Sequence, residues 1–74
     1  MTFRDVLLNQ DARCIIETGG VISIKNLIFN QEVQFYRYDA VSFFRYVNLP
    51  VLNYIPMSYK HEILILTTVD LTIY

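Results

Sequence analysis

The side chains in this sequence best suited to chemistry are its single histidine, His61, and its single cysteine, Cys14. Glu62 follows His61 directly, and a histidine beside a carboxylate can act as a general base or contribute to a metal site. Neighbouring residues on a strand point to opposite faces of the sheet, however, so these two side chains are poorly placed to cooperate. A metal site also needs three or four ligands, and the chain has no second histidine or cysteine. We therefore expect His61 to be a solvated residue at the start of a strand, and we expect no metal site.

Cys14 and His61 form the only possible thiol–imidazole pair in the chain. The apolar residues around Cys14 are typical of a strand and assign this thiol to the core, where it would be inert. The seven acidic residues are scattered and show no spacing typical of a catalytic carboxylate pair. The pair Gly19–Gly20 lacks the lysine and the spacing of a phosphate-binding loop. These observations predict a protein that is not an enzyme and that binds no cofactor.

The segment FYRYDAVSFFRY, residues 35–46, interleaves aromatic residues with Arg37 and Arg45. Single-stranded nucleic acids stack on exposed aromatic residues and arginines, so an Arg/Tyr surface on the sheet is one interpretation. The net charge of −1 argues against it, because nucleic-acid-binding domains usually carry a positive excess. Tyrosine and arginine are also enriched at protein interfaces, which need no basic field. The sequence therefore favours a protein partner, with nucleic-acid binding as the alternative.

Two short helices are predicted from capping residues and from apolar spacing. Thr2 and Asp5 fit a capping box at the start of a helix over about 2–10. Asp39 is a suitable N-cap for a second helix over 40–47. The apolar stripe of this second helix recurs at helical spacing and consists of Ala40, Phe43, Phe44 and Val47.

The segment 12–29 is rich in isoleucine and contains both glycines of the chain, which is typical of a β-hairpin. A three-residue loop, 18–20, puts the apolar side chains of the hairpin on one face and sets Arg13 opposite Lys25. This arrangement requires a positive φ at Gly20. The side chains assigned to the common face are Cys14, Ile16, Ile22, Ile24 and Ile28.

Further strands are predicted downstream. The segment 33–38 carries aromatic residues on both of its faces, which is typical of a strand that is covered on both sides. A loop of about ten residues should follow Pro50. The segment 61–74 then reads as one long strand, or as two strands bent near 67–70.

The predicted order of elements is α-β-β-β-α-β(-β), where the last strand is single or split. This order indicates an α+β fold in a single domain, residues 1–74. We expect an antiparallel sheet of about four to five strands with one or two short helices on one face.

The composition predicts contact with another chain. Of the 74 residues, 54% are hydrophobic and only 18% are charged, whereas soluble domains have roughly 25% charged residues. A small monomer hides only part of so much apolar surface. We expect a homo-oligomer, a dimer, whose contact includes the C-terminal strand, because no proline or lysine in 63–74 guards an edge. The chain has no run of about 18 apolar residues and no recognisable signal peptide, so we expect no membrane association and a cytoplasmic location.

These patterns lead to one functional hypothesis, a non-enzymatic protein–protein interaction module that acts as a small regulatory or inhibitory accessory protein. A viral or mobile-element origin, with the host cytoplasm as the location, is an expectation drawn from the class of small proteins and from no residue. The candidate interaction surface combines residues of 35–46 with residues of the C-terminal segment. Its members are Tyr36, Arg37, Tyr38, Arg45, Tyr46, Leu64, Leu66 and Tyr74.

Overall fold

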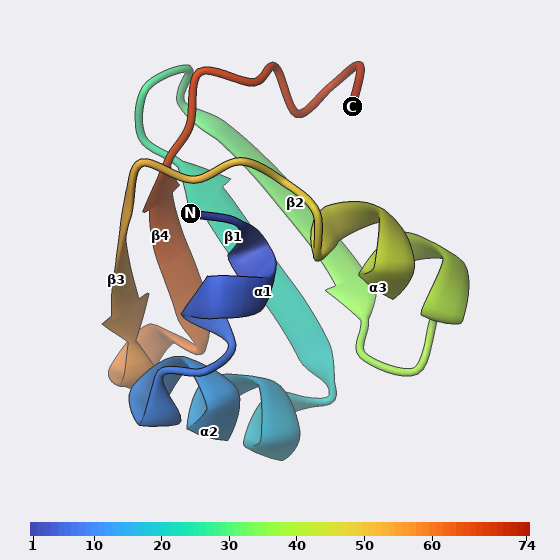
Figure 1. The fold of residues 1–74 in the computed structure, drawn as a ribbon. Helices are drawn as coiled ribbons and strands as arrows, with labels where there is room; N and C mark the ends of the chain where they lie inside the picture. The colour runs from blue at the N-terminus through green and yellow to red at the C-terminus, as the bar shows by residue number, and fades with distance from the viewer.

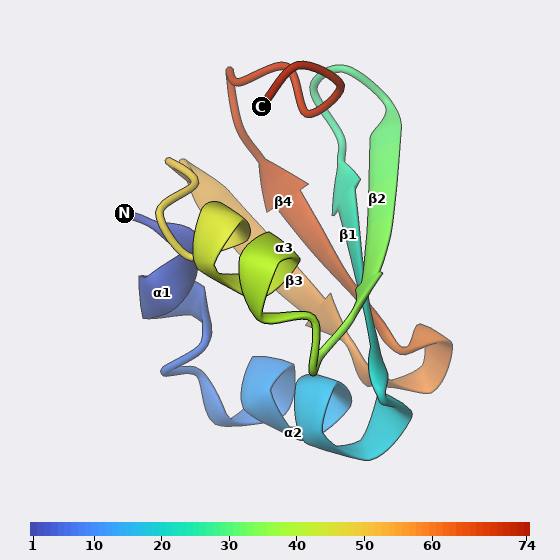
Figure 2. The same ribbon diagram turned by 90° about the vertical axis from the view of Figure 1, so that its right-hand side faces the viewer.

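A four-stranded sheet carries three α-helices on one of its faces in the computed structural model, which describes residues 1–74 (Figure 1). Figure 2, turned by 90°, shows the helices on the same side of the sheet. The helices are α1 (Phe3–Val6), α2 (Gln10–Gly19) and α3 (Ala40–Tyr46), and a short 3-10 helix, η1, spans Ser58–Lys60. The strands are β1 (Val21–Asn26), β2 (Gln31–Tyr36), β3 (Asn53–Met57) and β4 (Glu62–Leu66). Their order in space is β2-β1-β4-β3, and the predicted α+β class is confirmed.

The sheet is mixed, so the expectation of a purely antiparallel sheet is wrong. β1 pairs with β2, and β3 with β4, in antiparallel fashion. β1 and β4 are parallel, with Ile24 opposite Ile63. The chain passes through β2, α3 and β3 between these two strands, and a long connection of this kind is what a parallel pairing requires.

Residues 10–19, predicted as part of a hairpin, form helix α2 instead. The Asn9 side chain caps the helix by accepting hydrogen bonds from two backbone N–H groups of the first turn, at 2.9 and 3.2 Å. Gly20 ends the helix with a φ of +69°. The predicted positive φ is therefore confirmed, but it belongs to a helix C-cap and not to a hairpin loop. The buried residues of α2 follow helical spacing and are Ala12, Ile15 and Ile16.

Other expectations for the predicted hairpin, 12–29, are also wrong. Cys14, assigned to the core, is exposed on α2. Arg13 does not lie opposite Lys25, because its Nε donates to Glu17 Oε1 at 3.2 Å, one helical turn away. Ile28, also assigned to the core, is exposed in the turn between β1 and β2. The strand propensity of the β-branched residues in α2 is outweighed by the helix cap and by the burial of one apolar helical stripe.

β2 lies at an edge of the sheet and leads into α3. Phe35 is buried whereas Tyr36 is 71% exposed, so the expectation that both faces of this strand are covered is wrong. Only the face toward the helices is covered. The N-cap predicted for α3 is confirmed, since Asp39 Oδ1 accepts a hydrogen bond from the Ser42 N–H at 3.2 Å.

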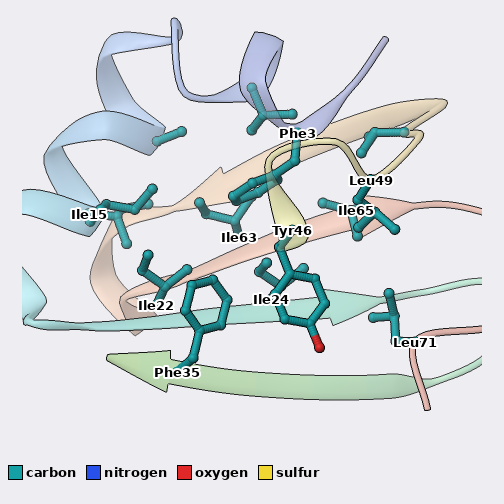
Figure 3. Packing of buried hydrophobic residues seen from close by; sticks show 14 residues of the cluster. Phe3, Ile15, Ile22, Ile24, Phe35, Tyr46, Leu49, Ile63, Ile65 and Leu71 are labelled. Carbon is teal, nitrogen blue, oxygen red and sulfur yellow. The ribbon is translucent and has the colours of Figure 1, made fainter. Parts of the chain in front are cut away.

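The buried side of α3 differs from the predicted stripe. Tyr46 is buried, and its ring stacks on Phe35 with the centroids 5.0 Å apart (Figure 3). Phe44, predicted in the core, is 67% exposed, and Ala40 is exposed as well. Val47 is buried as expected. The stacking of Tyr46 on an aromatic residue of the edge strand accounts for the rotation of this short helix.

The segment after Pro50, predicted as a loop, contains β3 and η1. Pro56 lies within β3, which is tolerated because β3 is an edge strand. Both predictions for 61–74, one long strand or two strands bent near 67–70, are also wrong, since β4 ends at Leu66 and the following residues are irregular. β4 is an interior strand of the sheet, so it offers no free edge for the dimer contact that we expected there.

Side-chain hydrogen bonds turn the chain away from the sheet after β4. The buried Asn26 donates from Nδ2 to the Thr67 carbonyl at 3.2 Å and accepts at Oδ1 from the Thr67 N–H at 3.3 Å. Gln31, the first residue of β2, donates to Asp70 Oδ1 at 2.6 Å and accepts from the Leu71 N–H at 2.9 Å. These contacts lay residues after β4 over the ends of β1 and β2 (Figure 1).

One hydrophobic core fills the space between the helices and the sheet (Figure 3). α1 contributes to it from a helix that ends at Val6, earlier than predicted, because Asn9 already caps α2. The cap predicted for α1 is confirmed, since the Thr2 N–H donates to Asp5 Oδ2 at 2.9 Å. The largest fully buried apolar residues are Phe3, Ile22, Ile24, Leu49, Ile63 and Ile65.

Candidate interaction surfaces

The face of the sheet opposite the helices is uncovered (Figure 2), and apolar side chains gather in its β3–β4 half between Asn53 and Glu62. Ile55 on β3 lies opposite Leu64 on β4 and is 53% exposed, while Leu64 and Leu66 are half-buried. Leu27, which directly follows β1, adjoins them, and the group lines a shallow cleft of about 50 Å³. We call Leu27, Ile55, Leu64 and Leu66 the open-face patch.

The β1–β2 half of the same face is polar. Lys25 lies opposite Glu32, and Ser23 lies opposite Gln34. The Ser23 hydroxyl and the Gln34 amide both donate to Glu32 Oε1, at 3.1 and 2.9 Å. The side chains of Ser23, Glu32 and Gln34 therefore satisfy one another, and the apolar half has no such internal partners.

Tyr36, Arg37 and Tyr38, which were predicted to form part of an interaction surface, lie together at the C-terminal end of β2. Both tyrosines are exposed. The Arg37 guanidinium lies 4.7 Å from the centre of the Tyr38 ring, and its Nη1 donates to the Glu17 carbonyl at 2.6 Å. This carbonyl belongs to the last turn of α2, where a cation is favoured by the helix dipole. Arg37 therefore connects the end of α2 to the end of β2.

The other predicted surface residues lie elsewhere. Arg45 is exposed in the last turn of α3. Tyr46 is buried, so it belongs to the core and not to the predicted surface. Tyr74 is partly buried against it, with the ring centroids 5.8 Å apart. Of the residues predicted in the C-terminal segment, Leu64 and Leu66 alone lie on the open face.

Two members of the open-face patch were not identified from the sequence. Ile55 fell in the segment predicted as a loop, and Leu27 fell in the segment predicted as a hairpin. The apolar run 27–29, between Asn26 and Asn30, is a signal that could have marked a turn with exposed side chains, and all three of its residues are exposed. Asn30 has a φ of +52°, a conformation that asparagine tolerates in turns.

Cys14 and His61, which were considered for chemistry, do not line the cleft of the open-face patch. His61 is exposed and directly precedes β4, which agrees with the expectation of a solvated residue at the start of a strand. Its φ is +52°, at the end of η1. Cys14 and His61 line separate surface hollows. No group of three or more histidine, cysteine, aspartate or glutamate residues is placed to hold a metal ion.

Two carboxylates with lowered pKa values flank β2. Hydrogen bonds from the backbone N–H and the hydroxyl of Ser42 lower the pKa of Asp39 below its ordinary value of 3.8. Hydrogen bonds from the side chains of Thr72 and Gln31 lower the pKa of Asp70 in the same way. Asp39 is exposed and Asp70 is half-buried, and their hydrogen bonds fix the chain at the two ends of the strand.

Comparison of the chain with protein-family models, with curated proteins and with solved structures gave no match. None of the helices has the length and apolar character needed to cross a bilayer.

Proposed function

We propose that this protein is a non-enzymatic protein–protein interaction module, a small regulatory or inhibitory accessory protein that binds its partner through the open-face patch. The observation that carries the proposal is the apolar half of the uncovered sheet face, where two neighbouring strands present Ile55, Leu64 and Leu66. Contiguous exposed apolar surface on a small protein is typical of a binding site. The partner is expected to present an apolar helix face or strand.

The surroundings of the patch support this choice. Interfaces combine an apolar centre with a polar rim, and Lys25 and Asn53 flank the patch on neighbouring positions of β1 and β3. The net charge of −1 provides no field for long-range attraction. Binding through such a surface is driven by burial of apolar area and should depend little on salt.

The cytoplasm is the compartment that we propose for this activity. Cys14 is an exposed free thiol, and free thiols persist where the compartment is reducing. If the protein is encoded by a virus, the compartment is the cytoplasm of the host.

The nucleic-acid alternative has weaker support. Arg37 is held by the carbonyl of Glu17 and by Tyr38, and Tyr46 is buried, which leaves two exposed tyrosines and Arg45 for such a surface. Proteins that bind nucleic acid need several cations near the phosphates. A titration with single- and double-stranded oligonucleotides at two salt concentrations tests this alternative, and we expect no binding at either.

The test of the proposed site compares affinity capture by the parent and by two variants from extracts of the cells that produce the protein. Ile55→Glu puts a charge at the centre of the patch, and Tyr59→Glu makes the same change at an exposed residue of η1. We expect a protein that is retained by the parent and by Tyr59→Glu and lost with Ile55→Glu. A titration of the purified pair should then show binding weaker by about ten-fold or more for Ile55→Glu. Equal binding by all three proteins would contradict the proposal.

A further inference from the structure

The two outer strands of the sheet, β2 and β3, differ in what they offer to a further strand. On β3, the Tyr54 N–H donates to the side chain of its neighbour Asn53 at 2.8 Å. Pro56, two residues on and therefore in the same phase of the strand, has no N–H. Proline in an edge strand lies with its nitrogen toward solvent. The outward positions of β3 therefore have no free N–H donor.

On β2 the outward N–H groups are free, whereas the Tyr36 carbonyl already accepts a hydrogen bond from the Asp39 N–H at 2.9 Å. The Arg37 N–H donates to the Gly20 carbonyl at 3.0 Å, and this bond continues the β1–β2 register. Because hydrogen bonding alternates along an antiparallel pair, the backbone groups of Glu32, Gln34 and Tyr36 point away from β1. No proline lies in β2, and no side chain accepts a hydrogen bond from the Glu32 or Gln34 N–H.

The surroundings of β2 leave room for a strand. A hollow of about 360 Å³ lies between the C-terminal half of β2 and the start of α3, lined by residues that include Gln34, Tyr36 and Ser42. In Figure 2, which looks toward the β2 side of the molecule, no helix is drawn over this strand. α3 therefore leaves the outer edge of β2 uncovered.

We propose that β2 binds β2 of a second copy of this chain in antiparallel fashion, with Gln34 on the two-fold axis. In this register Gln34 lies opposite Gln34 of the second copy, and Glu32 lies opposite Tyr36 of the second copy. The outward N–H groups of the strand then find partners, and the Tyr36 carbonyl accepts a second hydrogen bond beside that from the Asp39 N–H. Val33, which is half-buried, lies opposite Phe35 of the second copy, so the apolar layer under the helices continues across the contact.

Other registers are less favourable. In an antiparallel pair of identical strands, facing side chains lie on the same side of the sheet whenever the two-fold axis passes through a residue, so the alternative registers place the axis at a neighbouring residue. An axis at Glu32 sets two carboxylates directly opposite each other and pairs fewer residues. An axis at Val33 leaves Tyr36 without a partner and puts Glu32 opposite Gln34. The axis at Gln34 combines full pairing of the strand with no facing like charges. Because β2 is complementary to itself in this register, we infer that a second copy of the chain binds its edge.

This inference does not depend on the proposed function, because the open-face patch lies on β3 and β4 and leaves the edge of β2 free. A parent protein that binds its partner through the open-face patch but never dimerises would contradict only the β2–β2 contact.

Sedimentation velocity over a range of micromolar concentrations tests the contact. The parent should be a dimer at the upper concentrations. Gln34→Pro removes an N–H that β1 does not use, so dimerisation should weaken by about ten-fold or more while circular dichroism stays native. Gln34→Thr keeps the N–H and serves as the matched control, with dimerisation changed by less than about two-fold. A parent that is monomeric throughout, or a folded Gln34→Pro protein that dimerises like the parent, would overturn the inference.

A charge exchange at the same position tests the register without proline. Gln34→Glu and Gln34→Lys should each weaken self-association by about three-fold, because like charges then face each other at the axis. An equimolar mixture of the two variants should recover dimerisation. If Gln34→Lys alone dimerises more strongly than the parent, Gln34 faces Glu32, and the proposed register is wrong.

Discussion

β2 and β3 are the two edges of one small sheet, yet they differ in how they are protected from another strand. β3 has lost both outward donors, one to the Asn53 side chain and one because Pro56 has none. β2 keeps its outward donors at Glu32 and Gln34. Unprotected edges are a liability that natural proteins usually remove. A chain with one protected edge and one free edge can form a closed dimer through the free edge, and the protected edge prevents growth beyond the dimer.

The largest effect should come from removing the protection of β3. Asn53→Ala combined with Pro56→Val frees both outward N–H groups while β2 stays open. Because two open edges allow alternate β2–β2 and β3–β3 pairing without closure, we expect assemblies of many copies. Light scattering after size exclusion measures this. Adding Gln34→Pro should limit the assemblies to dimers, and a double variant no larger than the parent would contradict the comparison of the edges.

The next largest effect concerns Asn26, which fixes the chain that passes over the ends of β1 and β2. Asn26→Ala leaves the buried Thr67 backbone groups without partners and should lower the free energy of unfolding by about 2–4 kcal/mol. Asn53→Ala is the matched control, because Asn53 is exposed and caps only an edge N–H, and it should cost less than about 1 kcal/mol. Chemical denaturation measures both values. Equal costs would mean that Asn26 does not hold this segment.

The next prediction concerns Gly20, which ends α2 and whose carbonyl accepts a hydrogen bond from the Arg37 N–H just after β2. Its φ of +69° is unfavourable for a β-branched residue, so Gly20→Val should cost about 1–2 kcal/mol. The strain is that of the backbone, since an added Cβ meets nothing within 4 Å. Gly19→Ala is the control within α2 and should be neutral or stabilising by up to about 1 kcal/mol. If a thermal melt finds Gly20→Val as stable as the parent, this cap does not constrain the chain.

The smallest effect is the pH dependence that the carboxylates at the ends of β2 confer. The pKa values of Asp39 and Asp70 are lowered in the folded protein, so both groups bind fewer protons when folded than when unfolded. Their contribution to stability is present above the ordinary pKa of 3.8 and is lost as the pH falls through the lower folded value. We expect the melting temperature of Asp70→Asn to fall less than that of the parent between about pH 5 and pH 2. Identical slopes would show that this carboxylate is not bound as described.

Elements with strong local signals could be predicted from the sequence. Asp39 caps α3, Thr2 and Asp5 cap α1, and Gly20 has a positive φ, because caps and left-handed positions depend on a few neighbouring residues. α2 was misread although Ala12, Ile15 and Ile16 have helical spacing, because β-branched residues beside two glycines also fit a hairpin.

The arrangement of the strands could not be predicted in the same way. Pro56 excludes a central strand but is compatible with an edge, and nothing local indicates which strand will be outermost. The parallel pairing of β1 with β4 joins segments far apart in the chain. The open-face patch exists only because this pairing brings Leu27 beside β4 and Ile55 beside Leu64. The sequence therefore indicated an excess of apolar surface but not where that surface would lie.

Amide hydrogen exchange measured at a low and at a high protein concentration tests the difference between the two edges most directly. Protection of the Glu32, Gln34 and Tyr36 N–H groups should rise with concentration, since a second copy then pairs with them. The Tyr54 N–H on β3 should exchange at the same rate at both concentrations, because its partner lies within the same chain. Unchanged exchange on β2, or an equal change on both edges, would contradict the account.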